Sequence, residues 1–246
     1  MKRHPSGHGT ARTMFGTAML AFAITLAVAA PAAAQAELLG PGAAYVSAGV
    51  SLMSTGALDD RLDERGYPTF GRSATAFGIG GYRVLSSGAM LGLEATPFFM
   101  GEESRDGGDV SLGGGFATLG VGYAVRFGQR MRVYPRVGIG AGGLTMEFES
   151  AADTVDFDDV LDAPSPAPIE TDAALSRDGM VFDLGGGAEF LTGGNGGLLI
   201  GVRAGYLFAP WDDEWDLVYQ GRAIDGPDAS IAGPYVRLAL GWAWGR

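Results

Sequence analysis

The 246-residue chain lacks cysteine, and its two histidines, His4 and His8, lie in its first residues together with its only lysine, Lys2. The absence of cysteine excludes disulfides, thiol chemistry and a lipoprotein anchor. Without histidine, cysteine or lysine, the rest of the chain has few groups that could activate a serine or a water molecule. We therefore expect no enzyme activity, no catalytic residue and no cofactor, although a pair of carboxylates could in principle act as acid and base.

Acidic residues are missing from the start of the chain, where none precedes Glu37. Basic residues at positions 2, 3 and 12 are followed by an apolar run from Met14 to Ala30, then Pro31 and a string of small residues. A basic start, an apolar middle and a small-residue end are typical of a secretory signal peptide. We predict a signal peptide over residues 1–36, cleaved after Ala34 or Ala36. An uncleaved anchor is the alternative, against which Pro31 and the alanines argue.

Positive charge is scarce in the remaining chain, which we treat as one domain over residues 37–246. Three of the 17 basic residues lie in the predicted signal peptide, so the formal charge falls from −11 to −14 on cleavage. Such an acidic protein is not expected to bind nucleic acid.

No second apolar run is long enough for a transmembrane helix, so a membrane-bound protein of this sequence would have to cross as strands. Eight segments alternate between apolar and small or polar residues, each about 11 residues or longer, which suits a tilted strand in a bilayer. The predicted strands are 43–53, 73–84, 89–100, 112–127, 131–144, 180–191, 198–208 and 231–244.

The connections between these segments alternate between long and short. Three are tight, near residues 86–88, 128–130 and 192–197. Four are longer and polar, at 54–72, 101–110, 145–179 and 209–230, and they contain 24 of the 28 acidic residues. Short periplasmic turns and long outer loops are typical of outer-membrane barrels with an even number of strands. The sequence therefore predicts an all-β fold, an eight-stranded antiparallel up-and-down transmembrane β-barrel.

The two faces of the last strand show how the barrel is expected to lie. Val236, Leu238 and Leu240 share one face, and Arg237 and Ala239 share the other. Lipid contact requires the apolar face to point outward and the small or polar face inward. The same parity places seven charged residues in the lumen. They are Glu94, Arg126, Arg136, Asp183, Glu189, Arg203 and Arg237.

Charges inside a narrow barrel are costly unless they are paired, so we predict a network of arginines and carboxylates in the lumen. Such a network can simply fill and stiffen the barrel. Alternatively, it can line a gated path for water or small solutes. The interior of an eight-stranded barrel can be filled by side chains, which disfavours a wide pore.

Aromatic residues gather near strand ends, as expected for the girdles that mark the two membrane interfaces. The predicted girdle consists of Tyr82, Phe127, Phe190, Phe208, Trp242 and Trp244.

The segments RVYPRVGIGAGG (132–143), LLIGVRAGYLF (198–208) and the aromatic end 235–244 resemble the small outer-membrane β-barrel superfamily. Its members include the transmembrane domain of outer-membrane protein A and the OmpW- and OmpX-like proteins. The resemblance implies a monomer in outer-membrane lipid, inserted by the barrel-assembly machinery, which recognises the last strand. Gly245 and Arg246 follow the final aromatic residue here, a departure from the pattern of the family.

Other functions remain open at this point. A lipocalin-type periplasmic barrel would require an apolar lumen, which the inward charges oppose. A conduit for small ions or hydrophobic solutes is the main alternative to a structural or surface-interaction role. Acidic clusters at 153–162 and 212–216 offer oxygen ligands, but neither has the spacing of a calcium loop, so no metal site is predicted.

Overall fold

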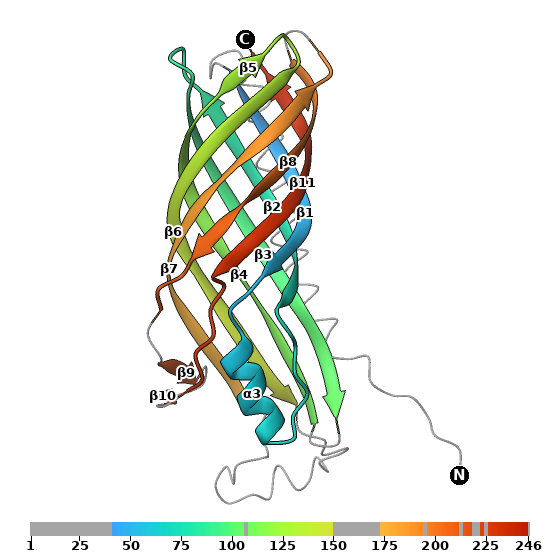
Figure 1. Ribbon diagram of the computed structural model, residues 1–246, viewed down its shortest axis with the longest axis vertical. Helices are drawn as coiled ribbons and strands as arrows, with labels where there is room; N and C mark the ends of the chain where they lie inside the picture. The colour runs from blue at the N-terminus through green and yellow to red at the C-terminus, as the bar shows by residue number, and fades with distance from the viewer. Residues whose placement is uncertain are drawn as a thin grey trace, which may run out of the picture.

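The computed structural model describes residues 41–105, 108–149, 173–193, 196–211, 214–217, 222–223 and 226–245. The predicted signal peptide lies outside these residues and stays a prediction. The described chain forms a closed antiparallel barrel (Figure 1). Its eight long strands are β1 (Gly42–Leu52), β2 (Ser73–Val84), β3 (Ala89–Arg105), β4 (Gly108–Tyr123), β6 (Met131–Glu149), β7 (Ala173–Leu191), β8 (Gly196–Phe208) and β11 (Gly233–Trp244).

Three short strands and one helix complete the described elements. They are β5 (Val125–Phe127), β9 (Trp215–Leu217), β10 (Arg222–Ala223) and α3 (Gly56–Glu64). β5 continues the line of β4 alongside β6, and β9 adds to the outer part of β7.

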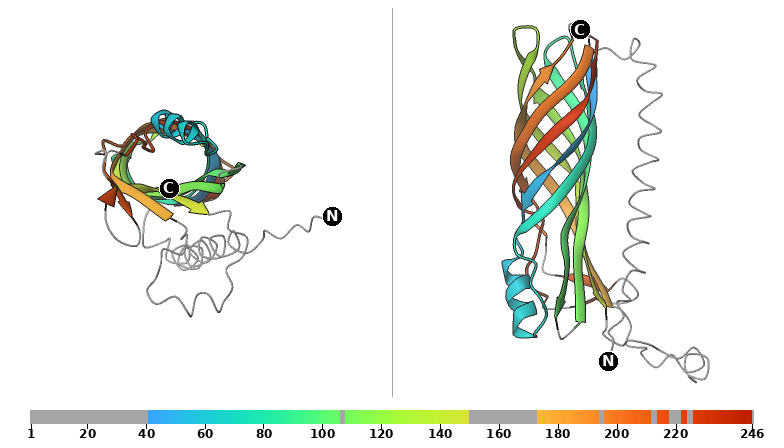
Figure 2. Two further views of the ribbon diagram at one scale, coloured as in Figure 1. Left: turned by 90° about the horizontal axis from the view of Figure 1, so that it is seen from below. Right: turned by 90° about the vertical axis from the view of Figure 1, so that its right-hand side faces the viewer.

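Each long strand pairs with its neighbours along the chain, and β1 pairs with β11 to close the ring. Val46 lies opposite Leu240 on β11 and opposite Ile79 on β2, so residues of the same outward parity meet across both ladders. Among the described residues, closure pairs each of the eight long strands on both sides along the part of the barrel that all of them share, which a membrane requires. The predicted eight-stranded barrel is confirmed, and the view along its axis shows the ring (Figure 2).

Four strands run further than the sequence suggested. The segments 101–105, 108–110, 145–149 and 173–179 were predicted as loop, yet they belong to β3, β4, β6 and β7. β6 and β7 each contain 19 residues, or roughly 60 Å of strand, against an apolar membrane band of about 25 Å. The barrel therefore continues well beyond the membrane on the side of the long connections.

The helix α3 was also not predicted. It lies in the first long connection, at the end of the barrel opposite the C-terminus (Figure 1). Leu58 and Leu62 point from it into a buried apolar cluster with Met53, Ala74 and Ile231. The helix thus covers part of the barrel interior where the strands have left the membrane.

The outward face of the barrel is apolar. Val236, Leu238 and Leu240 are 52%, 71% and 52% exposed, while Arg237 and Ala239 between them are buried. This arrangement suits lipid contact and rules out a soluble lipocalin-type barrel, whose apolar side chains would face inward.

Glycines on the inward face make room for large side chains in the narrow lumen. A Cβ atom on Gly187 would lie 2.7 Å from Cζ of Tyr134, and a Cβ on Gly80 would lie 2.7 Å from Cζ of Tyr45. Both distances are too short for a real contact. These glycines therefore leave the space that the bulky inward tyrosines occupy.

Candidate functional site

A single carboxylate, Glu94 on β3, lies in the lumen where arginines from three other strands converge. Oε2 of Glu94 accepts hydrogen bonds from Nη1 of Arg136 and from Nη1 of Arg203, each at 2.6 Å. Oε1 accepts from Nη1 of Arg237 at 2.8 Å. All four side chains are buried. One acceptor group therefore connects β3, β6, β8 and β11 across the barrel.

Neutral side chains complete this central layer. Thr118 accepts a hydrogen bond from Nη2 of Arg136 at 2.9 Å, and Thr96 accepts one from the β11 arginine at 2.9 Å. The Tyr45 hydroxyl donates to the central carboxylate at 3.2 Å and accepts a hydrogen bond from Arg203.

Asp183 on β7 supplies a second carboxylate to the same layer. Its Oδ2 lies 3.7 Å from Nη1 of Arg136, and its Oδ1 accepts a hydrogen bond from the Tyr235 hydroxyl at 2.8 Å. The ion pairs thus extend from β3 through β6 to β7.

A second layer lies nearer the end of the barrel that carries the short turns. Glu189 accepts hydrogen bonds from the hydroxyls of Tyr134, at 2.8 Å, and Tyr82. Nη1 of Arg132 donates to the Tyr82 hydroxyl at 2.7 Å and lies 4.0 Å from Glu189. All four side chains are buried, as they are in the central layer.

Aromatic rings support the guanidinium groups in both layers. Cζ of Arg203 lies 4.6 Å from the ring centroid of Tyr45, and Cζ of Arg237 lies 4.3 Å from that of Tyr235. In the second layer, Cζ of Arg132 lies 5.5 Å from the ring centroid of Tyr82. A cation held over a ring face is stabilised by the ring quadrupole, most strongly where water is excluded.

The two layers contain four arginines and three carboxylates, all of them buried. These are Arg132, Arg136, Arg203, Arg237, Glu94, Asp183 and Glu189. Removing one partner of such a group leaves a buried charge uncompensated, which costs about 3–5 kcal/mol. Each charged member of the network is therefore expected to contribute to the stability of the barrel.

Little space remains between the layers. A cavity of about 10 Å³ lies beside Tyr45, Tyr82 and Tyr134. A buried water needs roughly 10–15 Å³, so this cavity holds one water at most.

Apolar side chains fill the lumen beyond the central layer, towards the long connections. Leu58, Trp215 and Ile231 are 1%, 1% and 0% exposed, and they belong to one buried cluster. Arg177 crosses this region, where its Nη1 donates to the carbonyl oxygen of Ala229 at 2.8 Å.

Polar contacts fix the connection that carries α3. The Thr55 hydroxyl donates to the carbonyl oxygen of Gly71 at 2.7 Å, and the backbone N–H of Phe70 donates to Oδ1 of Asp59 at 2.9 Å. Partial burial raises the pKa of Asp59, an effect that the backbone N–H groups of Phe70 and Gly71 oppose.

Six of the seven charges predicted for the lumen lie inside it and take part in the two layers. Arg126 does not. It lies on β5, which pairs with β6 only and is exposed along its length. The neighbouring strand β3 begins at Ala89, opposite Tyr123, so β5 extends past the start of β3. The inward side of Arg126 therefore lies at the open mouth of the barrel.

Arg132 takes part in the second layer although it is not among the seven charges predicted for the lumen. It shares its parity with Tyr134 and Arg136 on the same strand, and that pattern could have revealed it. The inward tyrosines Tyr45 and Tyr235 were likewise not assigned to the network.

The predicted aromatic girdle needs one correction. Phe127, Phe190, Phe208 and Trp242 are 59%, 46%, 47% and 58% exposed on the outer wall. Trp244 has the same parity and is half-buried. Tyr82, in contrast, is buried in the lumen, because the parity that turns Phe77 outward turns Tyr82 inward.

The helix of the described residues is too short and too polar to cross a membrane. The predicted acidic cluster at 153–162 lies outside the described residues, as do Asp212 and Asp213 of the second cluster.

Two solved structures of outer-membrane proteins are similar to the chain at low sequence identity. One is Ail, the attachment invasion locus protein of Yersinia pestis (13% identity, TM-score 0.44, 83% of this chain and 97% of Ail). The other is a major outer membrane protein of Thermus thermophilus (10% identity, TM-score 0.44, 82% of this chain and 98% of that one). A search of curated protein sequences found no match.

Residues 20–220 match the family model described as the outer membrane protein beta-barrel domain. This match covers most of the chain, including seven of the eight long strands. The chain therefore belongs to the outer membrane β-barrel family, and its place is the bacterial outer membrane.

Proposed function

We propose that this protein is a non-catalytic outer-membrane barrel, with a closed lumen that has a structural role and an outer end that makes contacts at the cell surface. The observation that carries the proposal is the central layer, where Glu94 accepts hydrogen bonds from three arginines. Charges fixed in this way connect the barrel wall across its interior.

Two features favour a structural lumen over a conduit for ions or small solutes. The pore-lining charges of a channel must remain accessible to the permeating ion. Here Glu94 and Arg237 are 3% and 2% exposed and engage each other directly. In addition, apolar side chains around Ile231 fill the lumen beyond them.

The same contacts argue against catalysis. Glu94, Asp183 and Glu189 each accept hydrogen bonds from arginine or tyrosine side chains. A general base must be within reach of a substrate proton. Carboxylates engaged inside a packed lumen do not meet this condition.

The contacts with the surroundings would occur at the outer end. There, β6 and β7 pair as far as Phe148 and Ala173, well past the membrane zone. Together with α3 they extend the barrel at the end opposite the C-terminus (Figure 2).

We also propose that the protein is a monomer in outer-membrane lipid, inserted by the barrel-assembly machinery. The exposed apolar residues on the neighbouring strands β8 and β11, and on β4 further round the barrel, support direct lipid contact. The aromatic last strand supports recognition by the assembly machinery.

Conductance across a planar bilayer tests the closed lumen. The refolded wild-type protein is expected to insert without discrete current steps. Glu94→Ala is expected to lower stability without opening a current, because side chains still fill the lumen on both sides. Regular current steps from the wild-type protein, or steps that appear in Glu94→Ala at unchanged stability, would contradict the proposal and favour a gated conduit.

Shortening the β6–β7 extension tests the surface role. Met146 pairs with Leu175, so residues 147–174 can be replaced by a two-residue Asn-Gly turn. The shortened barrel should still insert and keep its heat-modifiable mobility on gels. Cells that express it should lose the self-association or surface attachment conferred by the full-length protein. Equal behaviour of both forms in these assays would count against a surface role.

A further inference from the structure

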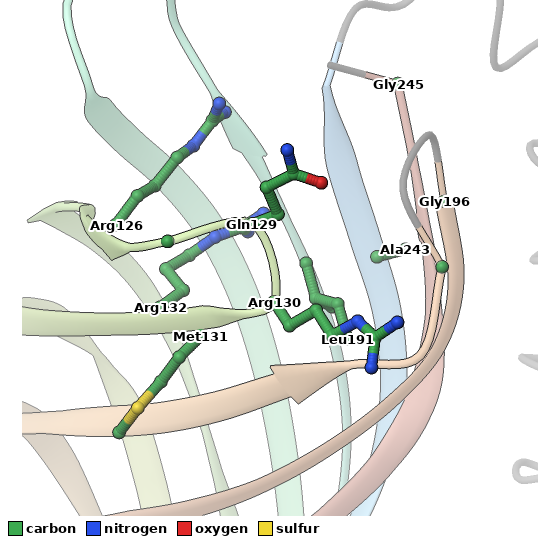
Figure 3. A pocket seen from close by; sticks show the side chains of 11 residues that line it. Arg126, Gln129, Arg130, Met131, Arg132, Leu191, Gly196, Ala243 and Gly245 are labelled. Carbon is green, nitrogen blue, oxygen red and sulfur yellow. The ribbon is translucent and has the colours of Figure 1, made fainter.

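A basic pocket lies at the mouth of the barrel that carries the short turns (Figure 3). In outer-membrane barrels this end faces the periplasm. The pocket has a volume of about 210 Å³ and lies between the β5–β6 turn and the β7–β8 connection. Three arginines line it together with Gln129, namely Arg126, Arg130 and Arg132.

Positive charge dominates this pocket in a chain whose formal charge is −11. Glu189, behind the pocket, lies 4.0 Å from Arg132 and offsets one of the three positive charges. Among the described lining residues, the remaining excess is about two positive charges.

The pairing of the strands places two of these arginines opposite each other in the ladder. Arg126 on β5 is the register partner of Arg132 on β6. Like charges directly opposite each other destabilise a strand pair. An anion that reaches both guanidinium groups would turn this repulsion into a pair of attractive contacts.

Arg132 also has an unused donor. Its side chain is 6% exposed, yet its Nε–H has no hydrogen-bond partner among the described residues. A buried donor without a partner costs about 1–3 kcal/mol or more. A ligand oxygen that reached this buried Nε–H from the pocket, where Arg132 is one of the lining residues, would satisfy it.

The walls of the pocket are set by backbone geometry. Gly128, in the β5–β6 turn, has φ +64°, and Gly196, at the start of β8, has φ +142°. Residues with side chains rarely adopt these angles. The frame around the arginines is thus defined before any ligand binds.

We propose that this pocket binds a phosphate group. The negative charge of a phosphate group offsets the excess positive charge, and arginine forks bind its oxygens in pairs. Neighbouring residues place the pocket at the level of lipid headgroups. Phe127, Phe190 and Trp242, which adjoin pocket residues in sequence, are exposed on the outer wall as interfacial aromatics. The phosphate can therefore come from an inner-leaflet lipid or from a soluble phosphate in the periplasm.

The test is a titration of the folded full-length protein in neutral maltoside micelles with inorganic phosphate. Sodium chloride keeps the ionic strength constant, so that general screening does not change. Binding is followed by its heat and by the NMR signal of the Arg132 Nε–H group. We expect saturable binding at one site with a shift of that signal. Absence of saturation, or saturation without a shift of the Arg132 signal, would overturn the proposal.

Exposed arginines provide the variants, since replacing them should leave the fold intact. Arg126→Gln combined with Arg130→Gln should weaken phosphate binding about tenfold or more, as expected when charge-assisted contacts are lost. Arg83→Gln is the matched control, because Arg83 is exposed near the same rim but does not line the pocket. Equal weakening by the control would show that rim charge alone attracts phosphate, and would overturn the proposal.

A second measurement identifies the source of the phosphate. The titration is repeated in nanodiscs of phosphatidylcholine with and without phosphatidylglycerol. Lower apparent affinity for inorganic phosphate in the anionic nanodiscs, and no such difference in the double variant, would show that lipid headgroups occupy the pocket. Unchanged affinity would support a soluble phosphate as the ligand.

Discussion

Glu94 is the shared acceptor of three buried guanidinium groups, and its removal has consequences on four strands at once. Arg136, Arg203 and Arg237 would each keep a positive charge in a lumen that excludes water. Hydroxyls of Thr96, Thr118 and Tyr45 cannot balance that charge. The stability of the central layer thus depends on this one carboxylate more than on any single arginine.

Glu94→Gln should lower the free energy of unfolding by about 3–5 kcal/mol, because it removes the charge of a buried ionic group. Urea unfolding in micelles, followed by the loss of heat-modifiable mobility, measures the change. Glu64→Gln is the control, since Glu64 forms only an exposed pair with Arg61 at 3.5 Å. Equal stability of the two variants would mean that the central charges are solvated rather than buried.

Tyr82 is the residue whose position in the structure differs most from its predicted role. A girdle tyrosine would contact lipid headgroups, whereas Tyr82 contacts Glu189 and Arg132 in the lumen. Tyr82→Phe should therefore destabilise the barrel by about 1–3 kcal/mol, because Glu189 and Arg132 lose a hydrogen-bond partner.

The same urea titration distinguishes the two positions of Tyr82. Tyr123→Phe serves as the comparison, because Tyr123 is 54% exposed on the outer wall. If Tyr82→Phe is as neutral as Tyr123→Phe, the hydroxyl of Tyr82 has no structural role in the lumen.

At the scale of elements, the strands divide into two parts. Lipid surrounds the outer wall of the membrane part, and water surrounds the outer wall of the part beyond the membrane. In the membrane part the outer wall is apolar and the lumen polar. In the outer part, buried residues such as Leu112, Leu144 and Met146 form an apolar interior like that of a soluble barrel. α3 closes one side of that interior with Leu58 and Leu62.

Leu58→Ala should lower the stability of this outer part by about 2–5 kcal/mol, the usual cost of a cavity at a fully buried leucine. The membrane part has its own network and should keep its heat-modifiable mobility. Trypsin treatment of intact cells detects the change, since Arg61, Arg65 and Arg72 lie in the α3 connection. Cleavage there should become faster in Leu58→Ala than in Ala57→Gly, which alters an exposed position of the same helix. Equal cleavage rates would show that Leu58 does not hold the helix on the barrel.

At the scale of the whole molecule, the tryptophans report the depth of the barrel in the membrane. Trp242 is 58% exposed on the outer wall, and Trp215 is 1% exposed in the outer interior. A variant that keeps Trp242 alone should lose fluorescence in bilayers of brominated lipid. A variant that keeps Trp215 alone should not, because protein surrounds its ring. Quenching of Trp215 to the same extent would place the outer part of the barrel inside the bilayer.

The sequence by itself determined the architecture, because strand alternation and connection length are local properties. The period of two in segments such as 236–240 requires one apolar face, and the alternation of tight and long connections requires antiparallel neighbours and an even number of strands. The same parity placed Glu94, Arg136, Arg203 and Arg237 in the lumen, since each has a small residue two positions away on the same face. Parity could also have identified Arg132 and Tyr82, whose neighbours two residues away point inward.

Only the tertiary structure decided how deep each residue lies and which residues meet. Arg126 has inward parity but lies beyond the end of β3, and strand parity carries no information on where a neighbouring strand ends. The outer extensions of β6 and β7 carry many polar residues, a pattern that predicts loops, because their outer wall contacts water instead of lipid. The contact between Glu94 and Arg203 joins residues 109 positions apart, and it is set by the stagger of the strands around the closed barrel.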